Sequence, residues 1–424
     1  MPTNPDLRFS EHSLANGLRI IFHLDRSLPL VAVNLWYHVG SKNERPGRTG
    51  FAHLFEHMLF QGSEHIKTNQ HFHYIQQVGG VANGSTWFDR TNYYETLPAH
   101  HLDLGLWLES DRMGFLLPAI TAENLETQRV VVMNERRQRV DNQPYGAANE
   151  RLHALLYPAD HPYHWPVIGY MEDIAAATLE DVRSFFRTYY TPNNAVLTVA
   201  GDFDPDLALA RIEDYFGDIP GGPPLPKVQP ALPPLGGERV DELTDDVRMP
   251  RVYLGFRSPA YGHPTWYAAD LLASSMTGGK SSLLYRDLVY DRQIAQDVGA
   301  YVDPSEAVAT FGVIATARPG VTAETLSAAL LEHVDRIATQ PLPAADVERA
   351  RNKVLTDYYS ALQKLDTRAD LFSQFQTYFN DPGGLEREVD IYRGLTSRDV
   401  LDYAAAYFAP DERVRISVVP RSAA

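Results

Sequence analysis

The sequence contains no cysteine among its 424 residues, which excludes disulfide bonds and thiolate chemistry. Any bound metal ion must therefore be held by His, Asp or Glu side chains. No apolar run approaches the roughly 18 residues of a membrane-spanning helix, so no membrane span is expected. Positive charge is also scarce, with 38 Lys and Arg against 54 Asp and Glu and a net charge of −16. A chain this acidic is not expected to bind nucleic acid.

The start of the sequence does not show the pattern of a secretory leader. The first five residues, Met-Pro-Thr-Asn-Pro, lack a charged segment followed by an apolar one. We therefore expect a cytoplasmic protein. A periplasmic protein is the alternative if a signal peptide has been removed.

The most informative stretch covers residues 49–60, Thr-Gly-Phe-Ala-His-Leu-Phe-Glu-His-Met-Leu-Phe, which contains His-x-x-Glu-His. In a helix, His53 and His57 lie side by side and Glu56 lies next to them, because residues three and four apart share a face. Two imidazoles at this spacing suit tetrahedral Zn²⁺, and the carboxylate can take a proton from a metal-bound water. This is the zinc-protease order His-Glu-x-x-His reversed, the inverzincin pattern. The alternative is a helix with two surface or core histidines.

Glu135 is the candidate for the third protein ligand that a catalytic zinc site needs. In the helix predicted over residues 122–140, Glu135 shares a face with Val131 and Val132. A carboxylate on an apolar face is costly unless it is paired or bound to a cation. The alternative is an ion pair with a neighbouring arginine such as Arg136.

A segment rich in Pro and Gly at residues 218–237 divides the chain into two similar halves. Proline excludes a helix or a central strand there, so we predict a semi-rigid linker. Thr178–Val182 and Thr396–Val400 repeat each other at an offset of 218, and each precedes an aromatic pair, a proline and a β-run. We predict an α+β fold of two homologous α/β-sandwich domains, each a mostly antiparallel sheet with helices packed on one face. Residues 1–217 would form the N-terminal zinc-binding domain, and residues 238–424 the C-terminal domain without a zinc motif.

The rest of the chain offers no second copy of the metal motif. In the second half, the corresponding positions hold Asp270, Ala273 and Ser274, which cannot form the same site. The histidine pairs at 71 and 73 and at 100 and 101 do not have the spacing of the helical motif. We expect those histidines to be exposed.

Together these residues resemble the M16 (pitrilysin-type) zinc metallopeptidases over nearly the whole chain. That family carries His-x-x-Glu-His followed, after about 76 residues, by a glutamate; here 77 residues separate His57 from Glu135. Residues 161–169 resemble the family's Pro-Tyr…Pro-x-x-Gly stretch. The length of two homologous halves resembles the M16B-type subunits related to the mitochondrial processing peptidase.

The resemblance implies a zinc-dependent endopeptidase in which His53, His57 and Glu135 bind zinc and Glu56 is the general base. Gln128 stands where the family often has an acidic residue, and would orient the metal ligands by hydrogen bonds without binding the metal itself. The alternative function is a non-catalytic assembly or core subunit of a larger complex.

The resemblance also implies how a peptide substrate binds. The family's edge strand, which would pair with an extended peptide by β-augmentation, corresponds to Asn83, Gly84, Ser85 and Thr86. The alternative is that these are ordinary polar residues of a turn and a strand.

A homologous partner subunit is the last implication. Active relatives carry an Arg and a Tyr about seven residues apart in the second domain, and this pair holds the substrate. Residues 301–312 contain no Arg, and Phe311 stands where the Tyr is expected. We therefore predict a heterodimer with an M16 subunit that supplies the Arg/Tyr pair and completes a clamshell around the peptide. A homodimer is the alternative.

Overall fold

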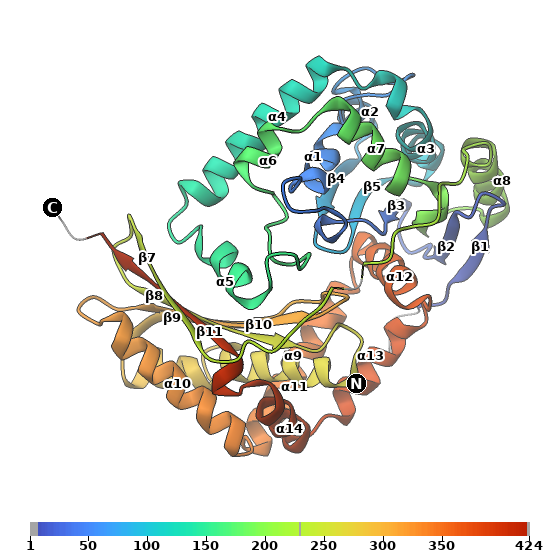
Figure 1. Cartoon of the computed structure of the whole chain (residues 1–424). Helices are drawn as coiled ribbons and strands as arrows, with labels where there is room; N and C mark the ends of the chain where they lie inside the picture. Colours follow the sequence, from blue (N-terminus) through green and yellow to red (C-terminus); the bar gives the residue numbers. More distant parts are fainter. Residues whose placement is uncertain (1–6, 229, 422–424) are drawn as a thin grey trace. The chain divides into compact units, whose positions relative to one another are not determined.

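Two α+β units make up the protein, each built on one β-sheet, in a computed structural model that describes residues 7–228 and 230–421 (Figure 1). The first unit combines the chain up to Arg136 with Trp165–Val228 and Tyr359–Glu386. The second unit combines Arg137–His164 with the chain between the linker and Tyr358 and with the segment that begins at Arg387. The two units therefore exchange segments of sequence.

This exchange bears on the predicted domains. The change of unit near residue 228 falls inside the predicted linker, 218–237. The ranges 1–217 and 238–424 do not coincide with the compact units, because each range contributes one segment to the other unit. The linear division stays a prediction about the duplicated sequence.

The first unit contains a six-stranded sheet in the order β1-β2-β6-β3-β5-β4. All neighbours are antiparallel except β2 and β6, which run parallel. The strands are β1 (Ser10–Ser13), β2 (Arg19–Leu24), β3 (Leu30–Tyr37), β4 (Val81–Thr86), β5 (Thr91–Pro98) and β6 (Ala195–Gly201). The helices are α1 (Phe51–Met58), α2 (Gln70–Gln77), α3 (Leu102–Ala119), α4 (Ala122–Arg136), α6 (Met171–Ala175), α7 (Leu179–Tyr189), α8 (Pro205–Phe216) and α12 (Leu365–Phe379).

Both faces of this sheet are covered. Side chains alternate along a strand, so Val31, Val33 and Leu35 of β3 face the main core. Ala32 faces the other way and packs with Ala369 of α12. Strand β3 is almost entirely apolar and buried for this reason.

The second unit contains a five-stranded sheet in the order β7-β11-β8-β10-β9. Its strands are β7 (Arg239–Asp245), β8 (Arg251–Ser258), β9 (Ala295–Val302), β10 (Ala309–Ala317) and β11 (Arg413–Pro420). Its α-helices are α5 (Ala148–Leu156), α9 (Pro264–Thr277), α10 (Ala323–Thr339), α11 (Ala344–Ala361), α13 (Gly384–Gly394) and α14 (Ser397–Tyr407). The last three residues of α11 and the first three of α13 belong to the first unit. Two π-helical segments, η3 (Arg137–Asp141) and η5 (Tyr285–Asp291), also belong to this unit.

The two sheets share one topology. The order β7-β11-β8-β10-β9 matches β2-β6-β3-β5-β4, and the single parallel pair, β7 with β11, matches β2 with β6. The repeated capped helices are also present. Thr178 and Asp181 form a capping box at the start of α7, and Thr396 and Asp399 form one at the start of α14. The predicted duplicated α+β fold is confirmed.

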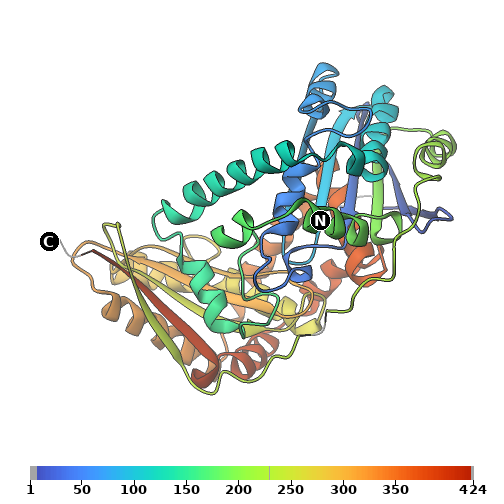
Figure 2. The same ribbon diagram turned by 45° about the horizontal axis from the view of Figure 1, so that its top comes forward.

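Each sheet carries one helix from the other half of the sequence. Helix α12 lies on the second face of the first sheet, where Asp370 accepts hydrogen bonds from Asn34, Trp36 and Asn92. Helix α5 lies on one side of the second sheet, and α9 and α10 lie on the other (Figures 1 and 2). The prediction of helices on one face therefore describes the main helical layer of each unit, to which one exchanged helix is added.

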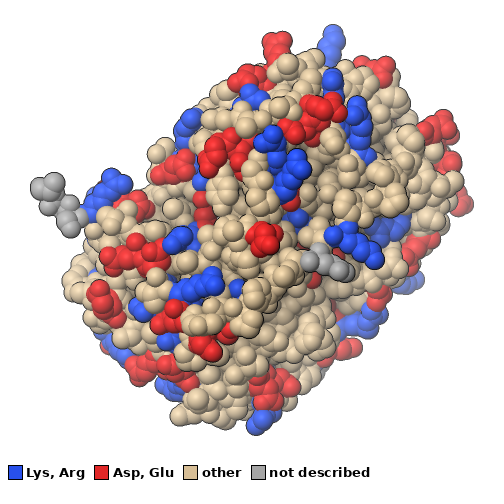
Figure 3. Space-filling model, viewed as in Figure 1, with Lys and Arg blue, Asp and Glu red and all other residues tan. Residues whose placement is uncertain are grey.

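The surface is of mixed charge. On the face shown in Figure 3, Lys and Arg side chains are interspersed with Asp and Glu, with no broad area of one sign. Among the described helices, none is long and apolar enough to cross a membrane.

Candidate metal centre

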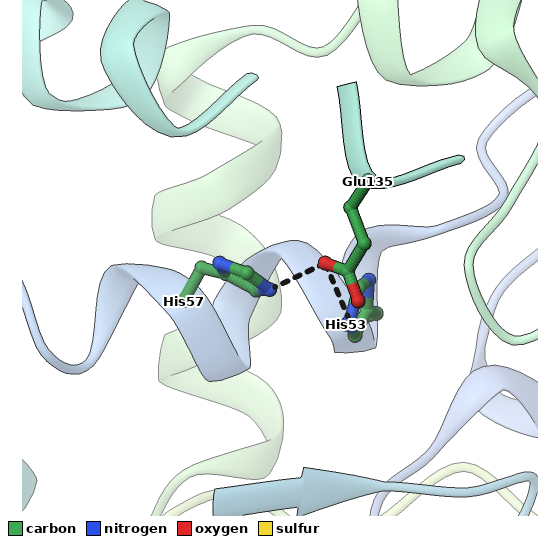
Figure 4. Close-up of side chains that lie close together, drawn as sticks. All are labelled: His53, His57 and Glu135. Atoms are coloured by element: carbon green, nitrogen blue, oxygen red, sulfur yellow. Dashed lines mark ion pairs between the residues drawn. The ribbon is translucent and has the colours of Figure 1, made fainter. Parts of the chain in front are cut away.

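Side chains from two helices of the first unit converge at the predicted metal site. His57 Nε2 lies 3.2 Å from Glu135 Oε2, and His53 Nε2 lies 3.7 Å from the same oxygen (Figure 4). The two imidazole ring centroids are 4.8 Å apart. The structure thus brings together the three residues that the sequence singled out, from α1 and from α4.

The local sequence explains why the two histidines point outward together. Leu54, Phe55 and Met58 occupy the opposite side of α1 and are fully buried in the main core. Burial of these three side chains fixes the rotation of the helix, because the apolar stripe must face the core. The histidines keep 12% and 23% of their side-chain surface exposed, so solvent and a ligand can reach them.

The donor set fits a zinc ion. Zinc–nitrogen and zinc–oxygen bonds of about 2.0–2.2 Å place neighbouring tetrahedral ligands about 3.3 Å apart. The distances of 3.2 and 3.7 Å from Glu135 Oε2 to His57 Nε2 and His53 Nε2 are close to this separation between ligands. One donor atom from each of the three residues lies within 4.8 Å of the others. Two neutral imidazoles and one carboxylate are also the chemistry of a catalytic zinc site.

Glu56 is held beside this cluster by a neighbouring strand. The Thr86 hydroxyl donates a hydrogen bond of 2.6 Å to Glu56 Oε2. Burial raises the pKa of Glu56, while the bond from Thr86 and the nearby His57 act to lower it. A carboxylate with a raised pKa at a fixed position is suited to accept a proton near neutral pH.

The four predicted substrate-binding residues lie on β4, at the edge of the six-stranded sheet. Gly84 lets this strand approach α1 closely, since a Cβ atom there would lie 3.2 Å from Glu56 Cγ. Thr86 contacts Glu56, whereas Ser85 donates to Asn92 on β5. Asn83 is exposed. The position at the edge is compatible with strand addition, which stays a prediction.

Gln128 lies on α4, seven residues before Glu135, and is 6% exposed. Seven residues correspond to about two helical turns, so both side chains lie on similar sides of the helix. A supporting role for Gln128 toward the metal ligands stays a prediction.

A second cluster of titratable residues was not expected from the sequence. His71, predicted to be exposed, is buried on α2 together with Glu95 of β5 and Glu109 of α3. Arg112 lies among them, with Nη2 2.6 Å from His71 Nε2 and 2.8 Å from Glu109 Oε1. The guanidinium already supplies the positive charge in this cluster, so we interpret it as a buried ion network. The sequence did contain one sign of this cluster. Glu109 and Arg112 lie three residues apart, and so on one face of a helix that also carries many apolar residues.

Two positions of the second unit that the sequence analysis singled out, Asp270 and Phe311, make contacts within that unit. Asp270, at the position that corresponds to His53, accepts a hydrogen bond of 2.7 Å from the Tyr392 hydroxyl. Phe311 is fully buried in the core of the unit, where its ring lies 5.0 Å from that of Phe408. Residue 311 is therefore a core residue here, and the absence of a substrate-holding tyrosine from this position stays a prediction.

Comparisons with known proteins cover most of the chain. Residues 19–163 match the family described as Insulinase (Peptidase family M16), and residues 176–354 match the Peptidase M16 inactive domain. The zinc protease PqqE of Helicobacter pylori is 29% identical over 412 residues, which cover 96% of this chain and 92% of that protein. An uncharacterized zinc protease of Mycobacterium leprae is 31% identical over 312 residues, which cover 73% of this chain and 69% of that protein.

A solved structure shares the fold along the whole chain. The crystal structure of a protease from Helicobacter pylori matches with a TM-score of 0.92 at 28% identity. The match covers 97% of this chain and 100% of that chain. The topology of both units is therefore found together in that protein.

Proposed function

Because the chain belongs to peptidase family M16, we propose that it is a zinc-dependent endopeptidase that hydrolyses peptides or unfolded segments. The observation that carries the proposal is the convergence of His53, His57 and Glu135 next to Glu56. Relatives of the chain are named zinc proteases, which supports the same class of activity.

His53, His57 and Glu135 would hold Zn²⁺, which when bound supplies Lewis acidity toward a peptide carbonyl and lowers the pKa of water. Glu56 accepts the proton that the attacking water loses and returns it to the leaving amine. The Thr86 hydroxyl keeps the Glu56 carboxylate in one orientation for both transfers.

Strand β4 would bind the substrate as an added edge strand of the sheet. A peptide can pair in this way only when it is extended and its own backbone groups are unpaired. Folded proteins rarely present such a segment, so the substrates we propose are peptides and unfolded chains.

We also propose a homologous M16 partner, as a heterodimer, with a homodimer as the alternative. The absence of Arg from residues 301–312 supports the proposal, as does the buried Phe311 at the position where the family's Tyr is expected. The mass of the native complex tests it. A monomer with full activity on a denatured peptide would end the idea of a site completed by a second subunit.

The Glu56→Gln variant tests the catalytic proposal. We expect the variant to retain zinc, measured by elemental analysis, and to lose peptidase activity, because the amide cannot accept a proton. Activity that survives the substitution would remove Glu56 from its role. A wild-type protein that neither binds zinc nor cleaves peptides would favour the alternative, a non-catalytic assembly subunit.

A further inference from the structure

Glu44, a residue outside the metal motif, holds the start of the metal-binding helix. Its Oε2 accepts a hydrogen bond of 2.9 Å from the Gly50 N–H, and its Oε1 accepts one of 2.8 Å from the Ala52 N–H. Glu44 follows the short helix η1 (Ser41–Asn43) and is partly exposed as a residue, but protein surrounds its carboxylate. Burial raises the pKa of Glu44, and the N–H bonds from α1 oppose that rise.

These bonds replace the cap that α1 lacks in its own sequence. The first N–H groups of a helix have no partner within the helix. Gly50 precedes α1 with φ +83° and has no side chain that could accept them. The carboxylate of Glu44 satisfies two of these donors and places negative charge at the positive end of the helix dipole.

The same helix start is held from a second direction. Asp173 Oδ2 accepts from both the N–H (3.1 Å) and the hydroxyl (2.7 Å) of Thr49. Gly50 also packs against Gly169 so closely that a Cβ on Gly169 would lie 2.3 Å from Gly50 Cα. Gly169 has φ +78°, a conformation that favours glycine.

This contact links α1 to the helix that carries the third ligand. Arg136 Nη1 donates a hydrogen bond of 2.8 Å to the Gly169 carbonyl, and Arg136 directly follows Glu135 on α4. The start of α1 and the end of α4 are thus attached to one loop. Any displacement of the α1 start changes the distance between the histidine pair and Glu135.

We infer that Glu44 is a positioning residue for the metal site: by fixing the start of α1 it sets the separation of His53 and His57 from Glu135. The inference rests on the proposed function, since it concerns the same zinc site. Glu44 acts through the backbone of Gly50 and Ala52, from whose N–H groups its carboxylate accepts hydrogen bonds.

The test is the zinc affinity of Glu44→Gln in the full-length protein, measured by competition with a chromophoric chelator. The amide of glutamine has one acceptor oxygen and sets an NH₂ group against a helix N–H. We expect zinc to bind about 10- to 100-fold more weakly, the range found when groups that orient metal ligands are removed. The visible absorption bands of the Co²⁺-substituted protein should shift as well, because they report ligand geometry.

Two further variants make the result decisive. Asp399→Asn alters the carboxylate of the exposed capping box at the start of α14 in the second unit, and should leave zinc affinity unchanged. Glu44→Asp keeps the charge and should bind zinc more tightly than Glu44→Gln but more weakly than the wild type. If Glu44→Gln does not fold, the zinc affinity of Glu44→Asp is compared with that of the wild type, and equal affinities overturn the inference. An unchanged zinc affinity and Co²⁺ spectrum in Glu44→Gln, or an equal loss in Asp399→Asn, overturns the inference. A wild-type protein that fails to bind zinc refutes the proposed function instead.

Discussion

The bond between Thr86 and Glu56 gives the sharpest prediction of the catalytic arrangement. Thr86→Val replaces the hydroxyl by a methyl group of similar size, so that the shape of β4 is kept while the 2.6 Å bond to Glu56 Oε2 is lost. Glu56 then keeps its place beside the histidines but has no hydroxyl to hold its carboxylate. The effect should fall on peptide hydrolysis and leave zinc binding intact.

The magnitude follows from the strength of a hydrogen bond to a charged group, about 1.5–3 kcal/mol. Each 1.36 kcal/mol is a factor of ten in rate. Because Glu56 is partly exposed, water replaces some of the lost bond, and the lower half of that range applies. We expect kcat/KM for an unstructured fluorogenic peptide to fall about 10- to 50-fold.

Thr86→Ser is the matched control, because it keeps the hydroxyl and removes only a methyl group. It should remain within about threefold of the wild-type kcat/KM. Zinc content is measured for each variant before the assay. If Thr86→Val is fully zinc-loaded and cleaves the peptide within twofold of the wild-type rate, the hydrogen bond has no role in orienting Glu56 and the reasoning is refuted.

Three further predictions concern the metal ligands and the buried charges. Glu135→Gln should lower zinc affinity about tenfold or more with little change in far-UV circular dichroism, since it removes an anionic ligand at the surface of α4; an unchanged zinc affinity would exclude Glu135 as a ligand. Arg112→Met should lower the free energy of unfolding by about 3–5 kcal/mol in urea titrations, because it leaves the buried carboxyl group of Glu109 without its cationic partner, and adding Glu109→Gln should recover part of the loss. Burial raises the pKa of Glu388 from 4.5 to about 7, so the folded state holds its proton more tightly than the unfolded state. Stability should therefore decrease as the pH rises from about 4.5 to 7, by up to about 3 kcal/mol, and Glu388→Gln should remove that part of the slope.

The convergence of the three candidate metal ligands could be predicted from sequence because their chemistry is local or strongly constrained. The spacing of His53 and His57 fixes their common face once the segment is helical, and Leu54, Phe55 and Met58 indicate which side is buried. Glu135 was chosen because it shares a helix face with Val131 and Val132, but only Val132 is buried, while Val131 is 42% exposed.

Other residues could not be found in this way because their partners lie far along the chain. His71 was expected to be exposed, but Glu109 and Arg112 of α3 enclose it. Glu44 is an ordinary acidic loop residue in the sequence, and only the folded chain places its carboxylate at the start of α1. The duplicated topology was visible in the repeated capping motifs, which are local.

The exchange of helices was equally invisible to pattern reasoning. Helices α5 and α12 have ordinary lengths, and nothing in their composition says which sheet they cover. The assignment depends on contacts such as those of Asp370 with Asn34 and Trp36, which join residues more than 300 positions apart.

The position of α12 also affects how the protein is made. The last strand of the first sheet ends at Gly201, and α12 begins 164 residues later, at Leu365. At about 5–20 residues per second, the ribosome needs roughly ten to thirty seconds to synthesise that interval. During this time α1, with both candidate metal-binding histidines, has already been synthesised, whereas the helix that packs on Ala32 and Ala200 has not. A chain released early, at the linker, would carry all three proposed zinc ligands and still lack the helix that covers the second face of its sheet.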